Sequence, residues 1–230
     1  DTIHVQSGDD IQSALDLAAV SQDVQRVLVH AGVYRPRSPS QAMIRFHARH
    51  DGLTLEASGD VTLTAENADV ARPGTASFPA IVNHIVYFGD GISQRTSLRG
   101  FRISGANGYV TSDEPDGPIE PNSHVPQLAK KLFFYMDGGA IKIFGRSWPT
   151  LENLVCEDNA TALCGGAVSI EHRGFQEDWV RIRNCVFRSN RCPATGSAVD
   201  VLEGSSAIIE NCLFHANIGN TGMDEVSREF

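Results

Sequence analysis

The sequence lacks the long apolar runs, the basic excess and the ligand spacings that define several common classes of protein. No apolar run approaches the roughly 20 residues that a helix needs to cross a bilayer, so no membrane span is expected. The 19 Lys and Arg are outnumbered by 28 Asp and Glu, which gives a net charge of −9. Nucleic-acid binding needs a basic face, so no nucleic-acid partner is expected either. Zinc is disfavoured because no Cys-x-x-Cys or paired-histidine spacing occurs.

What the sequence does contain favours a folded chain of short strands. Hydrophobic residues make up 41% of the 230 positions, which is enough for a continuous core. The 21 glycines suit a fold with many tight turns. The length fits one large domain or one solenoid, and we expect residues 1–230 to form a single domain.

Two interleaved sequence motifs repeat in the second half of the chain. The first, of the form GGA(I/V), starts at Gly138, Gly165 and Gly196. The second starts with an asparagine and ends with another asparagine six residues later, at positions 153–159, 184–190 and 211–217. The spacing falls within the range of solenoid repeats. Two motifs that drift together, with insertions between them, predict successive windings of one solenoid with loops of variable length.

Within each repeat, apolar and polar residues alternate over only a few positions. Val180 and Ile182 flank Arg181, and Ile141 and Ile143 flank Lys142 in the same way. Such short alternation is typical of half-buried strands and not of helices. A winding of this size cannot bury its apolar face alone, so windings must stack. We therefore expect an all-β fold, a right-handed parallel β-helix. Strand-like segments in the first half lie at 26–30, 43–46, 53–55, 61–63, 84–87 and 97–103.

Three departures from the repeat are expected. Residues 7–20 predict one helix that covers the N-terminal end of the stack, with Ile11, Leu15 and Ala18 on one face and Ser7 or Asp9 as its cap. Residues 106–137, rich in proline, predict a long loop insertion. No matching cap is evident at the C-terminus. We therefore expect that end to be uncapped, with further coils or a partner chain covering it.

The five cysteines are an odd number, so at least one thiol is free or pairs outside the chain. Cys185 and Cys212 occupy the same repeat position and are expected to be buried and inert. Cys164 and Cys192 lie in loops of neighbouring windings, where either a disulfide or two thiols fit the pattern. The repeated asparagines are expected to form structural ladders along the stack.

Two segments carry a resemblance to known β-helix proteins. The segment Ile11–Leu15, followed by Val27–Tyr34, resembles the opening of pectate-lyase-like proteins. The GGA(I/V) and Phe-x-x-Asn elements within 138–217 resemble the repeats of chlamydial polymorphic outer-membrane proteins. The resemblance implies a right-handed parallel β-helix with a site in a groove along one face. It fixes no chemistry, because this fold hosts lyases, hydrolases, epimerases and adhesins.

The candidate site is a column of side chains beside the GGA strands. If the flanking aliphatic residues point inward, Lys142, Ser169 and Asp200 point outward from three successive windings. The strand ends add Arg146, Glu171, His172, Arg173 and Glu203. A polysaccharide lyase needs a base and a cation, which the basic members would supply. A glycoside hydrolase needs two carboxylates, which Glu171, Asp200 and Glu203 would supply. The alternative is a solvated face with cross-strand charge pairs.

A second candidate is the acidic cluster of Asp113, Glu114 and Asp116, which predicts either a Ca²⁺ site or a solvated loop. Arg45, His47, Arg49 and His50 form a further cluster that either contacts an anion or lines a turn.

Together these features predict an extracytoplasmic bacterial protein, secreted, periplasmic or at the cell surface, that binds or cleaves polysaccharide. The alternative is a non-enzymatic adhesin or structural module of a larger protein.

Overall fold

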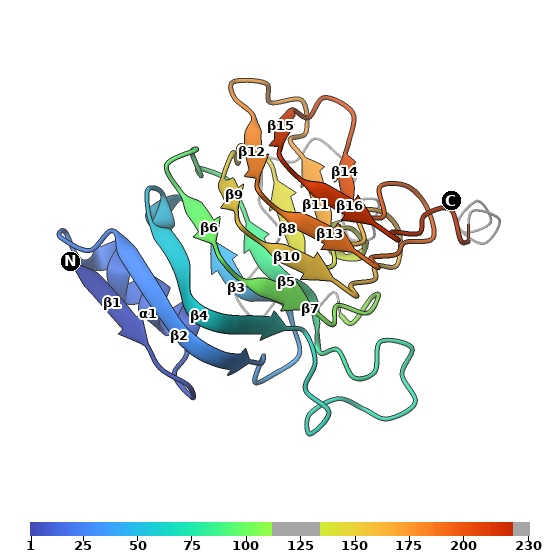
Figure 1. Cartoon of the computed structure of the whole chain (residues 1–230), viewed down its shortest axis with the longest axis horizontal. Coiled ribbons are helices and arrows are strands. Elements are labelled where there is room, and N and C mark those ends of the chain that lie inside the picture. The colour runs from blue at the N-terminus through green and yellow to red at the C-terminus, as the bar shows by residue number, and fades with distance from the viewer. Residues whose placement is uncertain (112–133, 223–230) are drawn as a thin grey trace.

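The computed structural model describes residues 1–111 and 134–222, and most of its regular structure is strand (Figure 1). One α-helix, α1 (Ile11–Val20), and one short 3-10 helix, η1 (Ala48–His50), accompany the strands. The strands are β1 (Thr2–Val5), β2 (Arg26–Tyr34), β3 (Ser40–Phe46), β4 (Thr54–Thr64), β5 (Val82–Phe88), β6 (Ser97–Arg99), β7 (Arg102–Ser104), β8 (Ile141–Phe144), β9 (Thr150–Glu152), β10 (Val155–Glu157), β11 (Val168–Glu171), β12 (Val180–Arg183), β13 (Val186–Arg188), β14 (Val199–Val201), β15 (Ala207–Glu210) and β16 (Leu213–His215).

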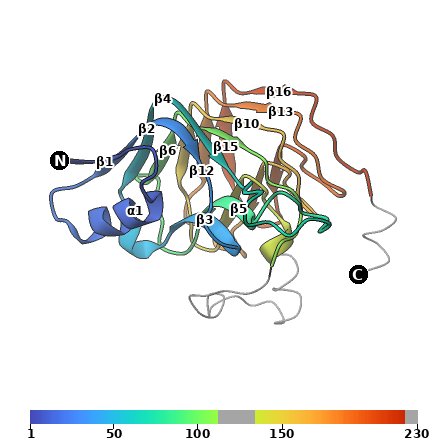
Figure 2. The same ribbon diagram turned by 90° about the horizontal axis from the view of Figure 1, so that it is seen from below.

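The named strands pair only in parallel, in three series that the chain visits in turn. One series is β3–β5–β8–β11–β14, and the other two begin on the long strand β4. Its first half leads into β6–β9–β12–β15 and its second half into β7–β10–β13–β16. The view in Figure 2 shows these strands as successive turns of a curved wall around a common interior. This arrangement of parallel sheets is consistent with a parallel β solenoid.

The register places equivalent residues of successive windings beside one another. Ile141 pairs with Val168, and Val168 pairs with Val199. Cys156 pairs with Phe187, which pairs with Phe214. The predicted stacking of the repeats is therefore confirmed. Except for Phe214 in the last described winding, these inward-facing side chains belong to one continuous core along the stack.

The first windings differ from the expected pattern of separate strands. Residues 53–55 and 61–63, expected as two strands, belong to the single strand β4. Conversely, the segment 97–103 divides into β6 and β7 at Gly100, whose positive φ of 79° turns the chain between the two strand series that meet on β4. The split therefore begins where a glycine can adopt the left-handed conformation.

The predicted helix forms but begins later than expected. It starts at Ile11, and its cap is Asp10, whose side chain accepts a hydrogen bond from the Ser13 amide. Ser7 and Asp9 do not cap it, because Asp9 instead accepts from the amide of Gln6. The buried face matches the prediction and packs on the strands of the N-terminal end (Figure 2).

Both asparagine columns are structural, as expected. Asn153, Asn184 and Asn211 adopt left-handed φ values of 54°, 54° and 51°, where asparagine is favoured. The other column is a hydrogen-bonded ladder. The amide and side-chain nitrogens of Asn159 donate to Oδ1 of Asn190, and those of Asn190 donate to Oδ1 of Asn217.

The last described winding leaves its inward-facing side chains uncovered. Phe187 is fully buried, whereas Phe214, at the same position one winding later, is 47% exposed. Ile182 and Ile209 differ in the same way, at 0% and 40%. The strands β14, β15 and β16 each end a series, with a neighbour on one side only. The two ends of the stack therefore differ, since α1 packs against the other one.

Candidate functional site

The column predicted beside the GGA strands exists, but it is not open to solvent. Lys142, Ser169 and Asp200 lie in register on β8, β11 and β14. Lys142 and Ser169 are completely buried, and Asp200 is 9% exposed. The expected solvated groove is therefore wrong at this column. An aromatic cluster that includes Tyr87, Phe134 and Phe144 packs on the same face.

Lys142 is the centre of this buried column. Its ammonium donates to Oε2 of Glu171 at 2.8 Å and to Oγ of Ser169 at 3.3 Å. Oδ2 of Asp137 lies 3.8 Å from the same nitrogen. The ammonium also lies 5.8 Å from the centroid of the Phe144 ring, within reach of a cation–π interaction. Lys142 thus joins two successive windings, those of β8 and β11, through polar contacts that are shielded from water.

The three carboxyl groups around Lys142 are held in different states. Burial raises the pKa of Asp137 to about 7, against the attraction of Lys142. Burial also raises the pKa of Asp200, although a hydrogen bond from Thr195 opposes it. Burial acts on Glu171 too, but contacts with Lys142 and Arg173 hold its pKa below the usual value. Glu171 is therefore the carboxylate that contacts both cations, Lys142 and Arg173.

Asp137 was not among the predicted site residues. It directly precedes the first GGA motif, at the position that Cys164 and Thr195 occupy before the next two motifs. Its Oδ1 accepts a hydrogen bond from the Cys164 amide at 2.9 Å. Alignment of the repeats could have found Asp137. The residues that directly precede the three GGA motifs occupy equivalent positions, so Asp137 is expected beside the same column as the motif residues.

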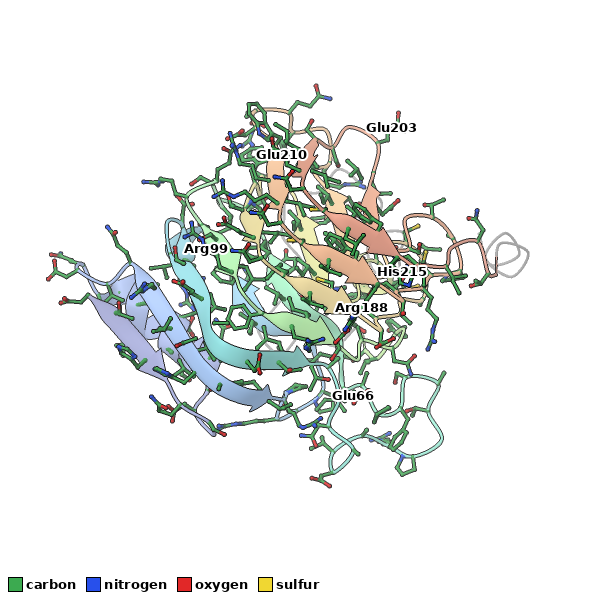
Figure 3. All side chains as sticks on the ribbon, in the orientation of Figure 1. Glu66, Arg99, Arg188, Glu203, Glu210 and His215 are labelled. Carbon is green, nitrogen blue, oxygen red and sulfur yellow. The ribbon has the colours of Figure 1, made fainter. Side chains whose placement is uncertain are left out.

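The other predicted residues are dispersed around the column. Arg146 is exposed, pairs with Glu177 at 3.1 Å and lies over the Phe175 ring at 4.2 Å. Arg173 pairs with Glu171 at 2.6 Å, so it belongs to the buried network. Glu203 lies on the exposed loop that follows β14 (Figure 3).

Both ring nitrogens of His172 contact backbone groups. Its Nε2 lies 3.0 Å from the carbonyl oxygen of Ser147, and its Nδ1 accepts from the Ser206 amide at 3.2 Å. These two bonds fix the neutral tautomer that carries its proton on Nε2. Burial also lowers the pKa of His172. The ring therefore joins the backbone at Ser147 to the backbone at Ser206.

The remaining expectations concern a metal site and a membrane span. Asp113, Glu114 and Asp116 lie outside the described residues. Within residues 1–111 and 134–222, no group of three or more His, Cys, Asp and Glu side chains is arranged to hold a metal ion. No helix in that same part of the chain is long and apolar enough to cross a membrane.

In the basic cluster near residue 47, His50 and Arg49 both contact Asp16 of α1. His50 is fully buried, and its Nε2 lies 2.9 Å from Oδ1 of Asp16 on α1. Arg49 donates to the same oxygen at 2.7 Å. These contacts fasten α1 to η1.

All five cysteines are free thiols, so the disulfide considered for Cys164 and Cys192 does not form in this structure. Burial raises the pKa of Cys185 to about 12 and that of Cys192 to about 11. Neither is therefore a thiolate near neutral pH.

Two ion-pair triads on the outer faces were missed from the sequence. Glu152 lies between Arg99 and Arg183, at 3.3 Å and 3.1 Å. On the neighbouring face, Glu157 lies between Arg102 and Arg188 in the same way. Arg99 and Arg188 are labelled in Figure 3. Burial opposes ionisation of Glu157, but the bonds from both arginines hold its pKa below the usual value.

Comparison with protein-family models, with curated proteins and with solved structures found no match to this chain. The chemistry of the site must therefore be argued from its own geometry. The column is closed, its ions are mutually paired, and its central lysine has no contact with solvent. This arrangement suits the joining of windings better than the binding of a polymer.

Proposed function

We propose that the chain is a right-handed parallel β-helix that serves as a non-catalytic structural or adhesive module of a larger assembly. The handedness follows from the general rule that parallel strands are joined by right-handed crossovers. The proposal keeps the expected location, secreted, periplasmic or on the surface of a bacterial cell. It also keeps the suggestion that further windings or a partner chain cover the C-terminal end.

The observation that carries the proposal is the change in burial between the last two windings of the described part of the chain. Side chains such as Phe187 and Ile182 are fully buried, and their equivalents Phe214 and Ile209 are nearly half exposed. Exposed apolar side chains beside unpaired strand edges are the features through which sheets add further strands. Because the exposed residues face the interior of the stack but have no layer beyond them, a further layer of strands would bury them as the preceding layer is buried.

A second candidate is the binding or cleavage of polysaccharide at the GGA face. It is favoured by the raised pKa values of Asp137 and Asp200 beside Lys142, since perturbed carboxyl groups gather at catalytic sites. The Oδ2 atoms of both aspartates also lack a hydrogen-bond partner within the described residues. Under this candidate, Asp137 and Asp200 would be the acid and base, and Lys142 would stabilise negative charge.

A screen of uronate-containing and neutral polysaccharides, with and without Ca²⁺, separates the two candidates. The absorbance of unsaturated products and the release of reducing ends should stay at background if the module is not catalytic. Turnover that Asp200→Asn abolishes, while Arg146→Ala leaves it intact, would instead establish the second candidate. Circular dichroism of each variant shows whether lost turnover reflects lost folding.

A further inference from the structure

The outer face of the stack carries a column of alternating charge that ends on an unpaired acid. Residues in register along successive strands are Glu56, Arg99, Glu152, Arg183 and Glu210. Glu152 contacts the arginines on both sides of it. Glu210, in the last described winding, has a strand neighbour on one side only, and no ion pair forms at it within the described residues. A residue added to the column beyond Glu210 would therefore continue the alternation if it were a lysine or an arginine.

The buried asparagine ladder also indicates that a further winding would fit this end of the stack. Asn159 and Asn190 each donate their backbone and side-chain N–H groups to an asparagine of the following winding. Asn217 accepts from Asn190 and donates to the carbonyl of Phe187, but its backbone N–H has no acceptor among the described residues. A layer that continued the stack would supply a side-chain oxygen to this amide.

From these two columns, together with the exposed Phe214, we infer that the C-terminal end accepts one more parallel winding, in which an arginine or lysine faces Glu210. The inference rests on the proposed function and adds the chemistry of the partner. An apolar residue would lie on Phe214, and an asparagine or aspartate would accept from Asn217. A hollow of about 510 Å³ beside Thr195, Phe214 and Asn217 leaves room for the turn that would enter this winding.

A second copy of the chain does not fit this end as well as a basic winding does. The sequence from residue 192 to residue 222 contains no lysine or arginine, whereas it contains Asp200, Glu203 and Glu210. In the residues that the structure describes, two such ends placed face to face would bring acidic surfaces together, and residues 192–222 would offer no lysine or arginine to either Glu210. The opposite end of the stack is occupied by α1, which packs on β1, β2 and β3. Charge complementarity therefore favours a basic segment of different sequence.

The test inserts a second copy of residues 165–195 between Gly222 and Met223 of the full chain. This copy keeps the repeat spacing and sets its own Arg183 opposite Glu210. Amide hydrogen exchange should slow at least about tenfold in β15, because its free edge becomes paired. The matched insertion with Arg183→Glu in the copy should exchange about two- to fivefold faster than the first, as loss of one cross-strand ion pair implies. In a Glu210→Gln background that difference should vanish.

The outcomes separate the two proposals. Equal protection by the arginine and glutamate insertions would overturn the inferred charge and leave the proposed function standing. No protection of β14–β16 by either insertion would overturn both. A native chain that forms a dimer with protected β14–β16 would show that a second copy is the occupant. If an insertion unfolds the body, binding of the synthetic peptide 165–195 to the native chain, compared with its Arg183→Glu form, makes the same distinction.

Discussion

At the residue scale, Lys142 is a charged side chain sealed inside the fold, and its partners determine what it contributes. Its ammonium is 2.8 Å from Glu171 and is wholly shielded from water. Removing one member of a buried ion pair leaves the other charge without compensation, which costs more than the pair itself contributes.

We expect Lys142→Met to lower the free energy of unfolding by about 3–5 kcal/mol, because Glu171 would keep only Arg173 as a counter-ion. Arg146→Ala is the matched control, since its pair with Glu177 is exposed and should contribute less than about 1 kcal/mol. Urea denaturation of both variants measures the difference. Similar losses for the two variants would mean that Lys142 is not buried as described.

Asp137 makes stability depend on pH. Burial raises its pKa to about 7 in the folded chain, whereas the unfolded chain titrates near 3.8. The folded state therefore holds the extra proton between these values, and its contribution to stability is complete below pH 4 and is lost as the pH rises through 7. His84 acts in the opposite sense: its pKa falls to about 3, so its contribution is present above pH 6.5 and is lost as the pH falls.

The variant Asp137→Asn isolates the first effect, because an amide oxygen can still accept from the Cys164 amide. Its unfolding free energy should match that of the native chain near pH 4. It should exceed the native value by about 2–4 kcal/mol at pH 8. Denaturation at pH 4, 6 and 8 measures this margin, and a margin that does not grow with pH would contradict the raised pKa.

The sequence could predict which side chains share this column but not their burial. The alternation in Ile141–Ile143 and Val168–Ile170 correctly predicts that Lys142 and Ser169 point away from the interior of the stack. The aromatic cluster beside Lys142 joins Phe144 of the same strand to Phe134 and Tyr87, which come from other segments and meet it only in the folded chain. Alternation describes one strand, and it holds no information about what packs on the strand's outer face.

At the scale of elements, each turn between strands is stabilised by its asparagines in two different ways. Asn184 supplies a left-handed backbone, whereas Asn190 supplies hydrogen bonds to the windings on either side. The two columns look alike in the sequence, since both are repeated asparagines.

We expect Asn190→Ala to cost about 2–4 kcal/mol, because the buried amide of Asn159 loses its acceptor. Asn184→Gly should change stability by less than about 0.5 kcal/mol, since glycine adopts the left-handed region freely. Thermal unfolding of the two variants checks the contrast. A large loss for Asn184→Gly would show that its side chain, and not its backbone, is the stabilising part.

Element boundaries were harder to predict than the elements themselves. The helix, the windings and the structural role of both asparagine columns were predicted, but the cap moved to Asp10 and two expected strands merged into β4. A cap depends on which of several neighbouring acids reaches the first free amides, and Asp9 is diverted by the amide of Gln6. Strand ends depend in the same way on turns such as that at Gly100, whose φ the residue types alone do not fix.

At the scale of the whole molecule, stability should decline toward the uncovered end. Phe187 and Phe214 are the same residue type in register, with ring centroids 5.2 Å apart, and differ chiefly in the layer beyond them. Phe187→Ala should cost about 3–5 kcal/mol, as for other buried phenylalanines. Phe214→Ala should cost about 1–2 kcal/mol, in proportion to its smaller buried area. Guanidinium denaturation gives both values, and equal losses would mean that Phe214 is already covered.

The alternation of Glu56, Arg99, Glu152, Arg183 and Glu210 has a consequence for how such a protein changes in length. Deleting the single turn of chain that carries Arg183 would set Glu152 against Glu210, and like charges directly opposite are destabilising. Deleting two adjacent turns keeps every acid facing a base. Gene duplication or loss is therefore tolerated best when it occurs in even steps, so homologues of different length should differ by pairs of repeats.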